Sequence, residues 1–295
     1  MRGEAPPWTK DRILAAYKFT NAYRASDRVS QFLIRNVIYS GDQTLDEVFL
    51  RTILFKIFNK VETWELLVKA FGEVSLRTFT PQGYGKVLDS AMNEGKRIYS
   101  AAYIMPSGGR NGEFKKKHDM HLHLLKRMME DSLPRKIQDC EKMVEAFHLL
   151  KSYPSIGDFL AYQFVTDLNY SPHLRFSEKE FVCAGPGAID GISKCFENSS
   201  RLPTEEIIKI MVELQHEEFR RLSIDFESLG GRELQLIDCQ NLFCEISKYS
   251  RVAHPEVLGI AGRTRIKQTF SMTGPPPIPW YPPKWNINQR IKNQL

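Results

Sequence analysis

Apolar residues recur at helical spacing along most of this 295-residue chain. Between residues 45 and 58, Leu45, Val48, Phe49, Thr52 and Ile53 follow one another in alternating steps of three and one, which places them on one face of a helix. The same spacing predicts helices near 26–38, 64–71, 84–98, 118–129, 134–150, 158–168, 204–222 and 234–249. Period-two alternation is scarce, so we expect an all-α fold, or nearly so.

Charged residues are unevenly placed, although the net charge is only +6. Residues 1–150 and 257–295 are each net basic, residues 151–256 are net acidic, and no Asp or Glu follows Glu256. This pattern predicts an anionic partner that is met by particular surfaces. We expect a helical domain over 1–256, with a division into two lobes near 105–117 as an option. A basic tail rich in Pro and aromatic residues covers 257–295, and its prolines favour an extended segment that wraps a surface.

Several classes of protein are disfavoured by what the sequence lacks. It has no apolar run of membrane-spanning length and no signal-peptide core at its start. We therefore expect a cytoplasmic protein that does not associate with a membrane. The five cysteines form no C-x-x-C pair and read as free thiols. No fourth ligand accompanies His118, His121 and His123, so no metal or other cofactor is expected. No G-x-x-x-x-G-K-[ST] motif occurs, which argues against a P-loop kinase.

A stripe of guanidinium and amide groups runs through the first predicted helices. The spacing of Asn21, Arg24, Arg28, Gln31 and Arg35 places them on one helical face. Because Arg offers a planar fork of donors, Arg24 and Arg28 suit phosphates or a base adduct, and Asn21 and Gln31 suit a base. The alternative is a solvated helix face with a local partner in Asp27.

Two turns could present backbone amides to phosphate. Tyr153-Pro154-Ser155-Ile156-Gly157 lies between two predicted helices and has the form of a helix-hairpin-helix turn, with Ser155 in place of the first Gly. Ser155, Ile156 and Gly157 are therefore candidate phosphate-binding residues, with a plain αα-hairpin as the alternative. Gly185 and Gly187, in a Gly-Pro-Gly turn, are further candidates for the same role.

Charged and amide side chains within apolar helices are the candidates for chemistry. If 236–251 is helical, Asp238, Asn241, Glu245 and Lys248 share one face of it. Unpaired buried charge is costly, so these groups should face a site or pair in a structural network. Asp167 and Asn169, near the end of the helix after the hairpin, could orient a ligand.

Four segments in order give a resemblance to a known family. FTNAYRASDRVSQFLIRNVIY, SIGDFLAYQFVTDLNYS, FVCAGPGAIDGISKCF and LIDCQNLFCEISKY resemble the α-glutamyl/putrescinyl-thymine pyrophosphorylase family, which overlaps the helical domain of 5-hydroxymethyluracil DNA kinases. The family is similar to helix-hairpin-helix DNA glycosylases, so the resemblance implies such a fold and double-stranded DNA as the partner, with no obligate protein partner. It is associated with hypermodified phage DNA and with excision in anti-phage defence.

The resemblance leads to an expected reaction. We expect a monofunctional DNA glycosylase that flips a hypermodified pyrimidine, such as a glucosylated or 5-hydroxymethyl-derived one, out of the duplex and hydrolyses its N-glycosidic bond. Its monofunctional character follows from Phe159, which occupies the position of a Schiff-base Lys. One of Asp167, Asp238 and Glu245, with Lys248 beside the last two, would be catalytic. Asn21, Gln31, Asn169 and Asn241 would contact the base. The alternatives are a pyrophosphorylase-type transferase that installs an amine on an activated 5-hydroxymethyl pyrimidine, and a non-catalytic DNA-binding module.

Overall fold

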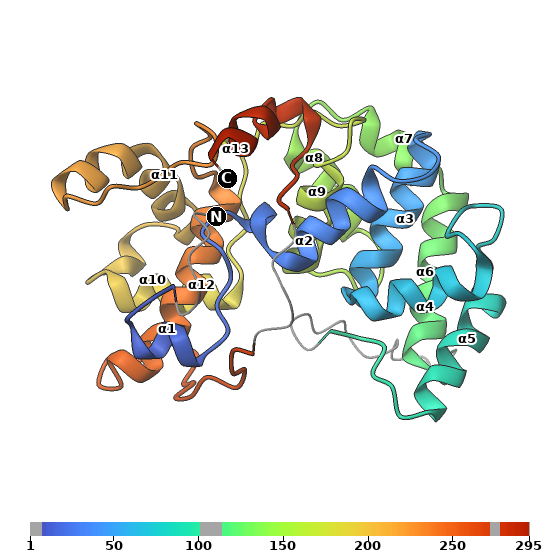
Figure 1. Cartoon of the computed structure of the whole chain (residues 1–295), viewed down its shortest axis with the longest axis horizontal. Coiled ribbons are helices and arrows are strands. Elements are labelled where there is room, and N and C mark those ends of the chain that lie inside the picture. The colour runs from blue at the N-terminus through green and yellow to red at the C-terminus, as the bar shows by residue number, and fades with distance from the viewer. Residues whose placement is uncertain (1–7, 101–113, 272–277, 295) are drawn as a thin grey trace. The chain divides into compact units, whose positions relative to one another are not determined.

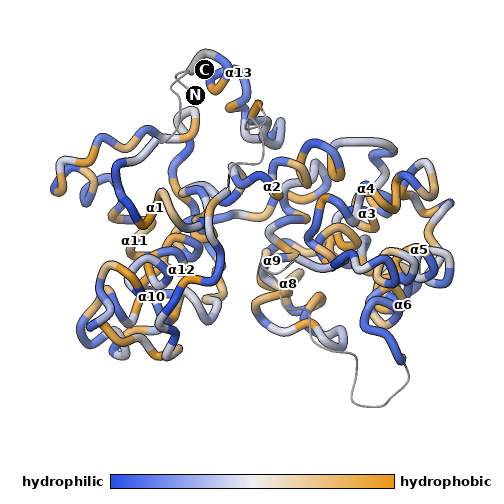
Figure 2. Tube along the Cα trace, turned by 60° about the horizontal axis from the view of Figure 1, so that its bottom comes forward, coloured by the Kyte–Doolittle hydropathy of each residue, from blue (hydrophilic) through white to orange (hydrophobic). Residues whose placement is uncertain are grey.

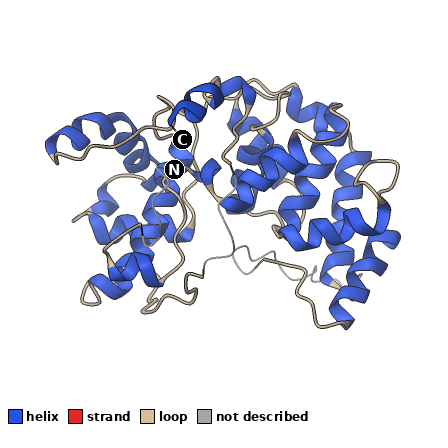
Figure 3. Cartoon of the chain, viewed as in Figure 1, coloured by secondary structure: helices blue, strands red, loops and turns tan. Residues whose placement is uncertain are grey.

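The computed structural model describes residues 8–100, 114–271 and 278–294, and its regular elements are helices (Figure 3). No strand occurs within those ranges, where only isolated bridges pair extended segments. The predicted all-α class is confirmed. No helix in the described ranges is both long and apolar enough to cross a membrane. The chain divides into a central unit, Val29–Ser177, and a terminal unit that combines Met1–Arg28 with Glu178–Leu295.

The central unit is built around one helix that is buried almost throughout. Helix α3 (Leu45–Phe58) contacts four α-helices and one π-helix of its unit, and only its first two residues escape burial. Figure 2 shows hydrophobic and hydrophilic residues alternating along the helices of this unit. The elements of this unit are α2 (Arg28–Phe32), η2 (Leu33–Ile38), α3, α4 (Val61–Phe71), α5 (Pro81–Asn93), α6 (Lys117–Glu130), α7 (Leu133–Gln138), α8 (Met143–Lys151) and α9 (Asp158–Leu168). Their arrangement can be followed in Figure 1.

The terminal unit is organised by two helices that approach closely. Its elements are α1 (Arg12–Ala16), η1 (Arg24–Ser26), α10 (Pro186–Cys195), η3 (Ser199–Arg201), α11 (Thr204–Arg221), α12 (Leu236–Ala253), η4 (Pro283–Trp285) and α13 (Asn288–Gln294). Helices α10 and α12 make the most extensive helix contact in the molecule. A Cβ at Gly191 would overlap the backbone carbonyl of Phe243, so only glycine lets the two backbones come this close.

Two expected helices differ from those observed. The stretch 134–150 is interrupted between α7 and α8, because Glu145 turns back to accept hydrogen bonds from the backbone N–H groups of Glu141 and Lys142 and so begins a new helix. The stretch 26–38 starts late because Asp27 is extended, and from Leu33 onward it continues as a wider π-helical turn.

The expected divisions of the chain also need restating. The two units meet in sequence at 28/29 and 177/178. Most of 105–117 lies outside the described residues, so a division there stays a prediction. The division into 1–256 and a tail stays a prediction. The described part of the tail does not only wrap a surface, because it ends in α13. Tyr281, Ile287 and Ile291 are buried, and Arg290 donates a hydrogen bond to the carbonyl of Gly230.

Candidate functional site

An N-terminal segment, residues 17–27, lies along helix α12 in the terminal unit. Tyr17 pairs with Thr269 in an antiparallel bridge, and the Tyr23 hydroxyl donates to the carbonyl oxygen of Arg232 at 2.6 Å. Just before the segment, Asp11 caps α1 and accepts a hydrogen bond from the Tyr249 hydroxyl of α12 at 2.6 Å. These contacts fix the segment against α12, so its polar groups meet those of the helix.

Asp238, in the first turn of α12, holds the segment in place. Its side chain is buried, Oδ1 accepts the backbone N–H of Arg24 at 2.8 Å, and Oδ2 accepts that of Gln235 at 2.9 Å. Burial raises the pKa of Asp238 to about 6, although both hydrogen bonds act in the opposite direction. Both oxygens are used by backbone donors, so the geometry assigns Asp238 a clamping role.

Glu245 and Lys248 form an ion pair one turn apart on α12. Their N···O distance is 2.6 Å, and their side chains are 16% and 21% exposed, respectively. Glu245 also accepts the backbone N–H of Thr20 at 3.1 Å, and the Lys248 ammonium lies 4.8 Å from the centroid of the Phe19 ring. The pair is therefore tied to the N-terminal segment but keeps partial access to solvent.

Asp27, in the N-terminal segment, is a second carboxylate near the Glu245–Lys248 pair. It accepts the backbone N–H of Asn21 at 3.1 Å. Burial raises the pKa of Asp27 above its ordinary value, and the negative charge of Glu245 raises it further. The hydrogen bond from Asn21 and the positive charge of Arg24 act in the opposite direction. Glu245 accepts the backbone N–H of Thr20 and Asp27 accepts that of Asn21, so the two carboxylates bind consecutive amides of the segment. We call Asn21, Arg24, Asp27, Glu245 and Lys248 the α12 cluster.

The α12 cluster combines donors and acceptors suited to a polar ligand. Its two carboxylates can accept hydrogen bonds from hydroxyl or amino groups, its amide can do both, and its cations can balance a phosphate. The side chain of Asn241, half-buried on the same helix, makes no hydrogen bond within the described ranges. The structure brings Arg24 and the residues around Thr20 and Asn21 to the predicted polar face of α12, a meeting that the sequence patterns did not predict. Asp27 was read only as a local counter-ion, because no local pattern reveals that Glu245 binds the neighbouring amide.

The residues predicted to form a stripe between 21 and 35 do not lie on one helical face. Asn21 lies in a loop, Arg24 is buried in η1, Arg28 is exposed at the start of α2, and Gln31 is buried in the central unit. The extended backbone of Asp27 separates η1 from α2, so the side chains on either side are no longer in one helical register. Of the stripe, only Asn21 and Arg24 belong to the α12 cluster.

The two glycines predicted to bind phosphate have a packing role in the structure. Gly185 is the buried N-cap residue of α10. A Cβ at Gly187 would lie 2.9 Å from the Cys244 sulfur, so this glycine permits the close contact of α10 with α12. That contact accounts for Gly187 without a ligand, and phosphate binding there stays a prediction.

Two predicted residues of the central unit are sealed in its core. The Lys56 ammonium lies 3.1 Å from the Asp167 carboxylate, and both side chains are almost completely buried. Asn169 donates to the carbonyl of Phe176 and accepts its N–H, at 3.1 and 3.0 Å, and so closes the turn after α9. Because the carboxylate is paired and the amide is used on both sides, neither residue is presented to a substrate.

The hairpin between α8 and α9 has the backbone that its sequence indicates. Ser155, which stands where the motif has Gly, adopts a φ of 67°, the left-handed conformation that glycine favours. Ile156 is buried and Gly157 is the N-cap residue of α9. The turn thus exists as an αα-hairpin, and its contact with DNA phosphate stays a prediction.

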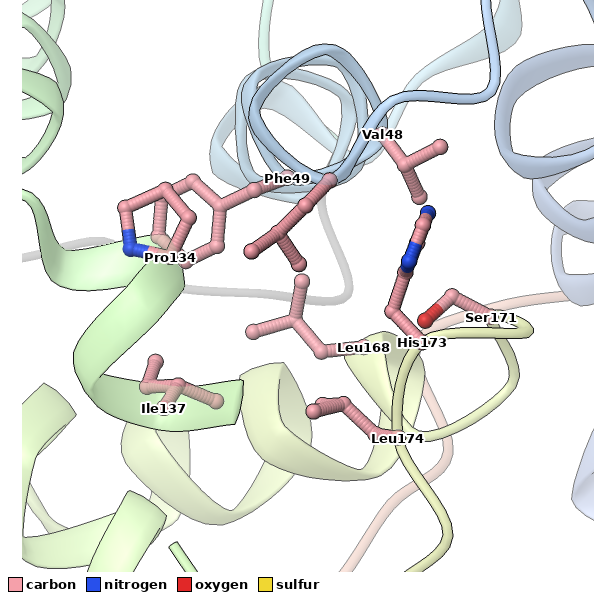
Figure 4. Close-up of a pocket in the computed structure, with 9 residues that line it drawn as sticks. Val48, Phe49, Pro134, Ile137, Leu168, Ser171, His173 and Leu174 are labelled. Carbon is pink, nitrogen blue, oxygen red and sulfur yellow. The ribbon is translucent and has the colours of Figure 1, made fainter. Parts of the chain in front are cut away.

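Two hollows are lined by residues of the central unit. The pocket in Figure 4 is enclosed mainly by apolar side chains such as Phe49, Pro134 and Leu168, with His173 and Ser171 on one side. Its volume is about 10 Å³, enough for about one water molecule. A more polar hollow is lined by Arg127, Asp131, Leu133, Lys136, Leu149, Ser152, Tyr153 and Pro154. Across the described ranges, no group of three His, Cys, Asp or Glu side chains is arranged to hold a metal ion.

Fold and site define an all-helical protein whose polar groups gather along one long helix of its terminal unit. The chain belongs to the family of the helical domain of 5-hmdU DNA kinases, whose family model matches residues 1–259. It is also 23% identical over 273 residues to the 5-hmdU DNA kinase of Bacillus phage SP10. The match covers 84% of this chain and 41% of that kinase, so the chain spans about two fifths of the curated relative's length. No solved structure matches the chain.

These matches overturn the expected reaction. The kinase part of the family resemblance is confirmed, but the predicted DNA glycosylase is wrong, because both matches name a DNA kinase and neither indicates hydrolysis of an N-glycosidic bond. The matches also give no support to a helix-hairpin-helix glycosylase relationship or to phage defence. The transferase alternative is nearer, since a kinase transfers a group, but the pyrophosphorylase reaction is not the one named.

Proposed function

We propose that this chain binds DNA containing 5-hydroxymethyl-2′-deoxyuridine (5-hmdU) and recognises the modified nucleotide as part of a phosphotransfer system. The family match supports 5-hmdU in DNA as the substrate, and the α12 cluster is the proposed binding site. The observation that carries the proposal is that Asp27 and Glu245, both partly buried, bind the consecutive backbone amides of Asn21 and Thr20, with Lys248 paired to Glu245. All of these residues fall within the matched range.

The chemistry of the α12 cluster fits the distinguishing group of this nucleotide. A 5-hydroxymethyl group differs from a methyl group by one hydroxyl, and a carboxylate is a strong acceptor for its proton. A site built to accept that hydrogen bond discriminates against thymine, because binding thymine leaves a desolvated carboxylate without its partner. Asn21 and Asn241 supply amides for the base edges, and the partly exposed Lys248 supplies positive charge for phosphate.

The chain itself shows no phosphate-binding motif of the P-loop type. We therefore assign it the recognition of the acceptor, not the binding of the phosphoryl donor. In this arrangement the α12 cluster holds the hydroxymethyl group, and a separate catalytic site transfers the phosphoryl group to it.

The proposal is tested by the equilibrium binding of fluorescent oligonucleotides that contain either one 5-hmdU or one thymine. We expect the wild-type chain to prefer 5-hmdU by about tenfold, which corresponds to about one hydrogen bond to a charged group. Glu245→Gln and Asp27→Asn should reduce that preference, whereas Glu213→Gln on exposed α11 should retain it. Equal affinity of the wild type for both oligonucleotides would refute base recognition, and unchanged preference in both cluster variants would refute the assigned place.

A further inference from the structure

A tight turn after helix α12 exposes two aliphatic side chains to solvent. The turn closes where the N–H of Gly262 meets the carbonyl of Gly259, and Gly262 has a φ of 58°. Leu258 is 80% exposed and Ile260 is 74% exposed, the two highest values among large apolar residues of the described ranges. We call residues 257–262 the apolar turn; it belongs to the loop that follows α12 in Figure 1.

The apolar turn is anchored firmly to the terminal unit. Buried Asp190 of α10 accepts the N–H of Ala261 at 2.7 Å, and its second oxygen accepts from the Ser247 hydroxyl and lies 3.3 Å from the Lys194 ammonium. A Cβ at Gly259 would overlap Asp190 and Lys194, so glycine is required there. Asp190 keeps a lowered pKa: burial opposes this, but the hydrogen bonds from Ser247, Ala261 and Lys194 outweigh it. The contacts with Asp190 thus fix the backbone of the turn, so its two aliphatic side chains stay exposed to solvent.

Cations follow the apolar turn directly. Arg263, Arg265 and Lys267 are exposed, and in the described part of the chain none of their side chains forms an ion pair. No acidic residue occurs from 257 to 295. Arg251 lies beneath them: its pKa is lowered by burial first and by the charge of Arg263 next. This surface therefore favours an anionic partner.

We infer that the apolar turn is a wedge that enters between stacked base pairs of DNA while Arg263, Arg265 and Lys267 bind the adjacent phosphates. Proteins that kink DNA use aliphatic side chains in this way, with cations on the flanking backbone. A protein partner fits less well, because two side chains and three cations form a surface far smaller than a stable interface requires. The inference rests on the proposed function for DNA itself, but adds a second contact that is separate from the α12 cluster.

Fluorescence of 2-aminopurine within a duplex tests the wedge, because the probe brightens when its neighbours unstack. With the wild-type chain we expect about a threefold increase, which the double variant Leu258→Ala/Ile260→Ala abolishes. The matched control is Leu222→Ala/Ile224→Ala, which removes an exposed aliphatic pair of the same spacing from the same unit and should retain the increase. Replacement of Arg263, Arg265 and Lys267 by Gln should reduce the slope of log affinity against log salt by about 2.7.

The outcomes separate the wedge from the proposed function. If duplex DNA binds with 5-hmdU preference but 2-aminopurine stays dark, or brightens equally in Leu258→Ala/Ile260→Ala, the wedge is refuted and the proposed function stands. If no duplex binds at all, both are refuted. If anionic lipid vesicles bind the wild type and not this double variant, while duplex affinity and 2-aminopurine fluorescence are the same for both, the apolar turn is a membrane contact and the wedge is refuted.

Discussion

The buried ion pair of the central unit and the carboxylates where α12 meets the N-terminal segment are stabilised in different ways. In the central unit, Asp167 is paired with the Lys56 ammonium and excluded from solvent, so its charge is balanced inside the core. In the terminal unit, Asp238 is held by two backbone amides, and Asp27 and Glu245 bind consecutive amides of the N-terminal segment at a partly open place. A balanced charge serves the fold, whereas like charges brought together need a ligand or a proton to relieve them. The difference separates a structural core from a candidate binding site.

The largest effect is expected from breaking the central pair. Lys56→Ala leaves Asp167 buried without its cation and should lower the free energy of unfolding by about 3–5 kcal/mol. Urea unfolding measures the loss, and hydrogen exchange of peptides from residues 29–177 locates it. The double variant Lys56→Met/Asp167→Leu removes both charges and should recover most of the stability. A decrease in the free energy of unfolding of less than about 1 kcal/mol in Lys56→Ala would mean that the ion pair does not stabilise the core.

The next effect concerns the pH dependence of Asp238. Its pKa is raised to about 6 in the folded chain, so between pH 4 and 6 the native state holds a proton that the unfolded state has released. Stability should therefore fall as pH rises through this range, by about 3 kcal/mol from this one group. Unfolding measured from pH 4 to 7 should show a smaller fall in Asp238→Asn than in the wild type. The control Asp225→Asn, at an exposed position, should keep the full fall, and identical slopes in all three proteins would contradict the assignment.

A smaller effect is expected at the α12 cluster. Glu245→Gln removes a partly exposed ion pair and retains an acceptor for the Thr20 N–H, so the loss of stability should be about 1 kcal/mol or less. Thermal or urea unfolding checks this, with the 5-hmdU preference measured on the same sample. A loss near that of Lys56→Ala would place Glu245 among the structural charges and erase the contrast between the units.

The smallest effect lies in the hairpin of the central unit. Ser155→Gly should change stability by no more than about 0.5 kcal/mol, because relief of the left-handed backbone is offset by the greater freedom of glycine in the unfolded chain. Ser155→Val should lose about 1–2 kcal/mol, since a β-branched residue tolerates this conformation poorly. Chemical unfolding of the two variants side by side provides the measurement. Equal stability would show that the turn can rearrange.

Local sequence signals predicted local structure well and distant contacts poorly. Residues 45–58 and 158–168 are helices with the expected bounds, because their buried faces impose a period on the sequence. The face of α12 that carries Asp238, Glu245 and Lys248 was predicted for the same reason. Its meeting with Thr20, Arg24 and Asp27 was not, since those contacts join residues more than two hundred positions apart. Nor does the period of 134–150 reveal that Glu145 starts a new helix.

The pairing of Tyr17 with Thr269 has a consequence for how the protein emerges from the ribosome. The central unit is complete in sequence once residue 177 has been made, whereas residues 8–28 find their partners only after α12 and the stretch near 269 have followed. At bacterial or eukaryotic rates of synthesis the N-terminal segment waits ~10–50 s. A nascent chain stalled at residue 235 should therefore be protected from protease within 29–100 and 114–177 and cleaved within 8–28.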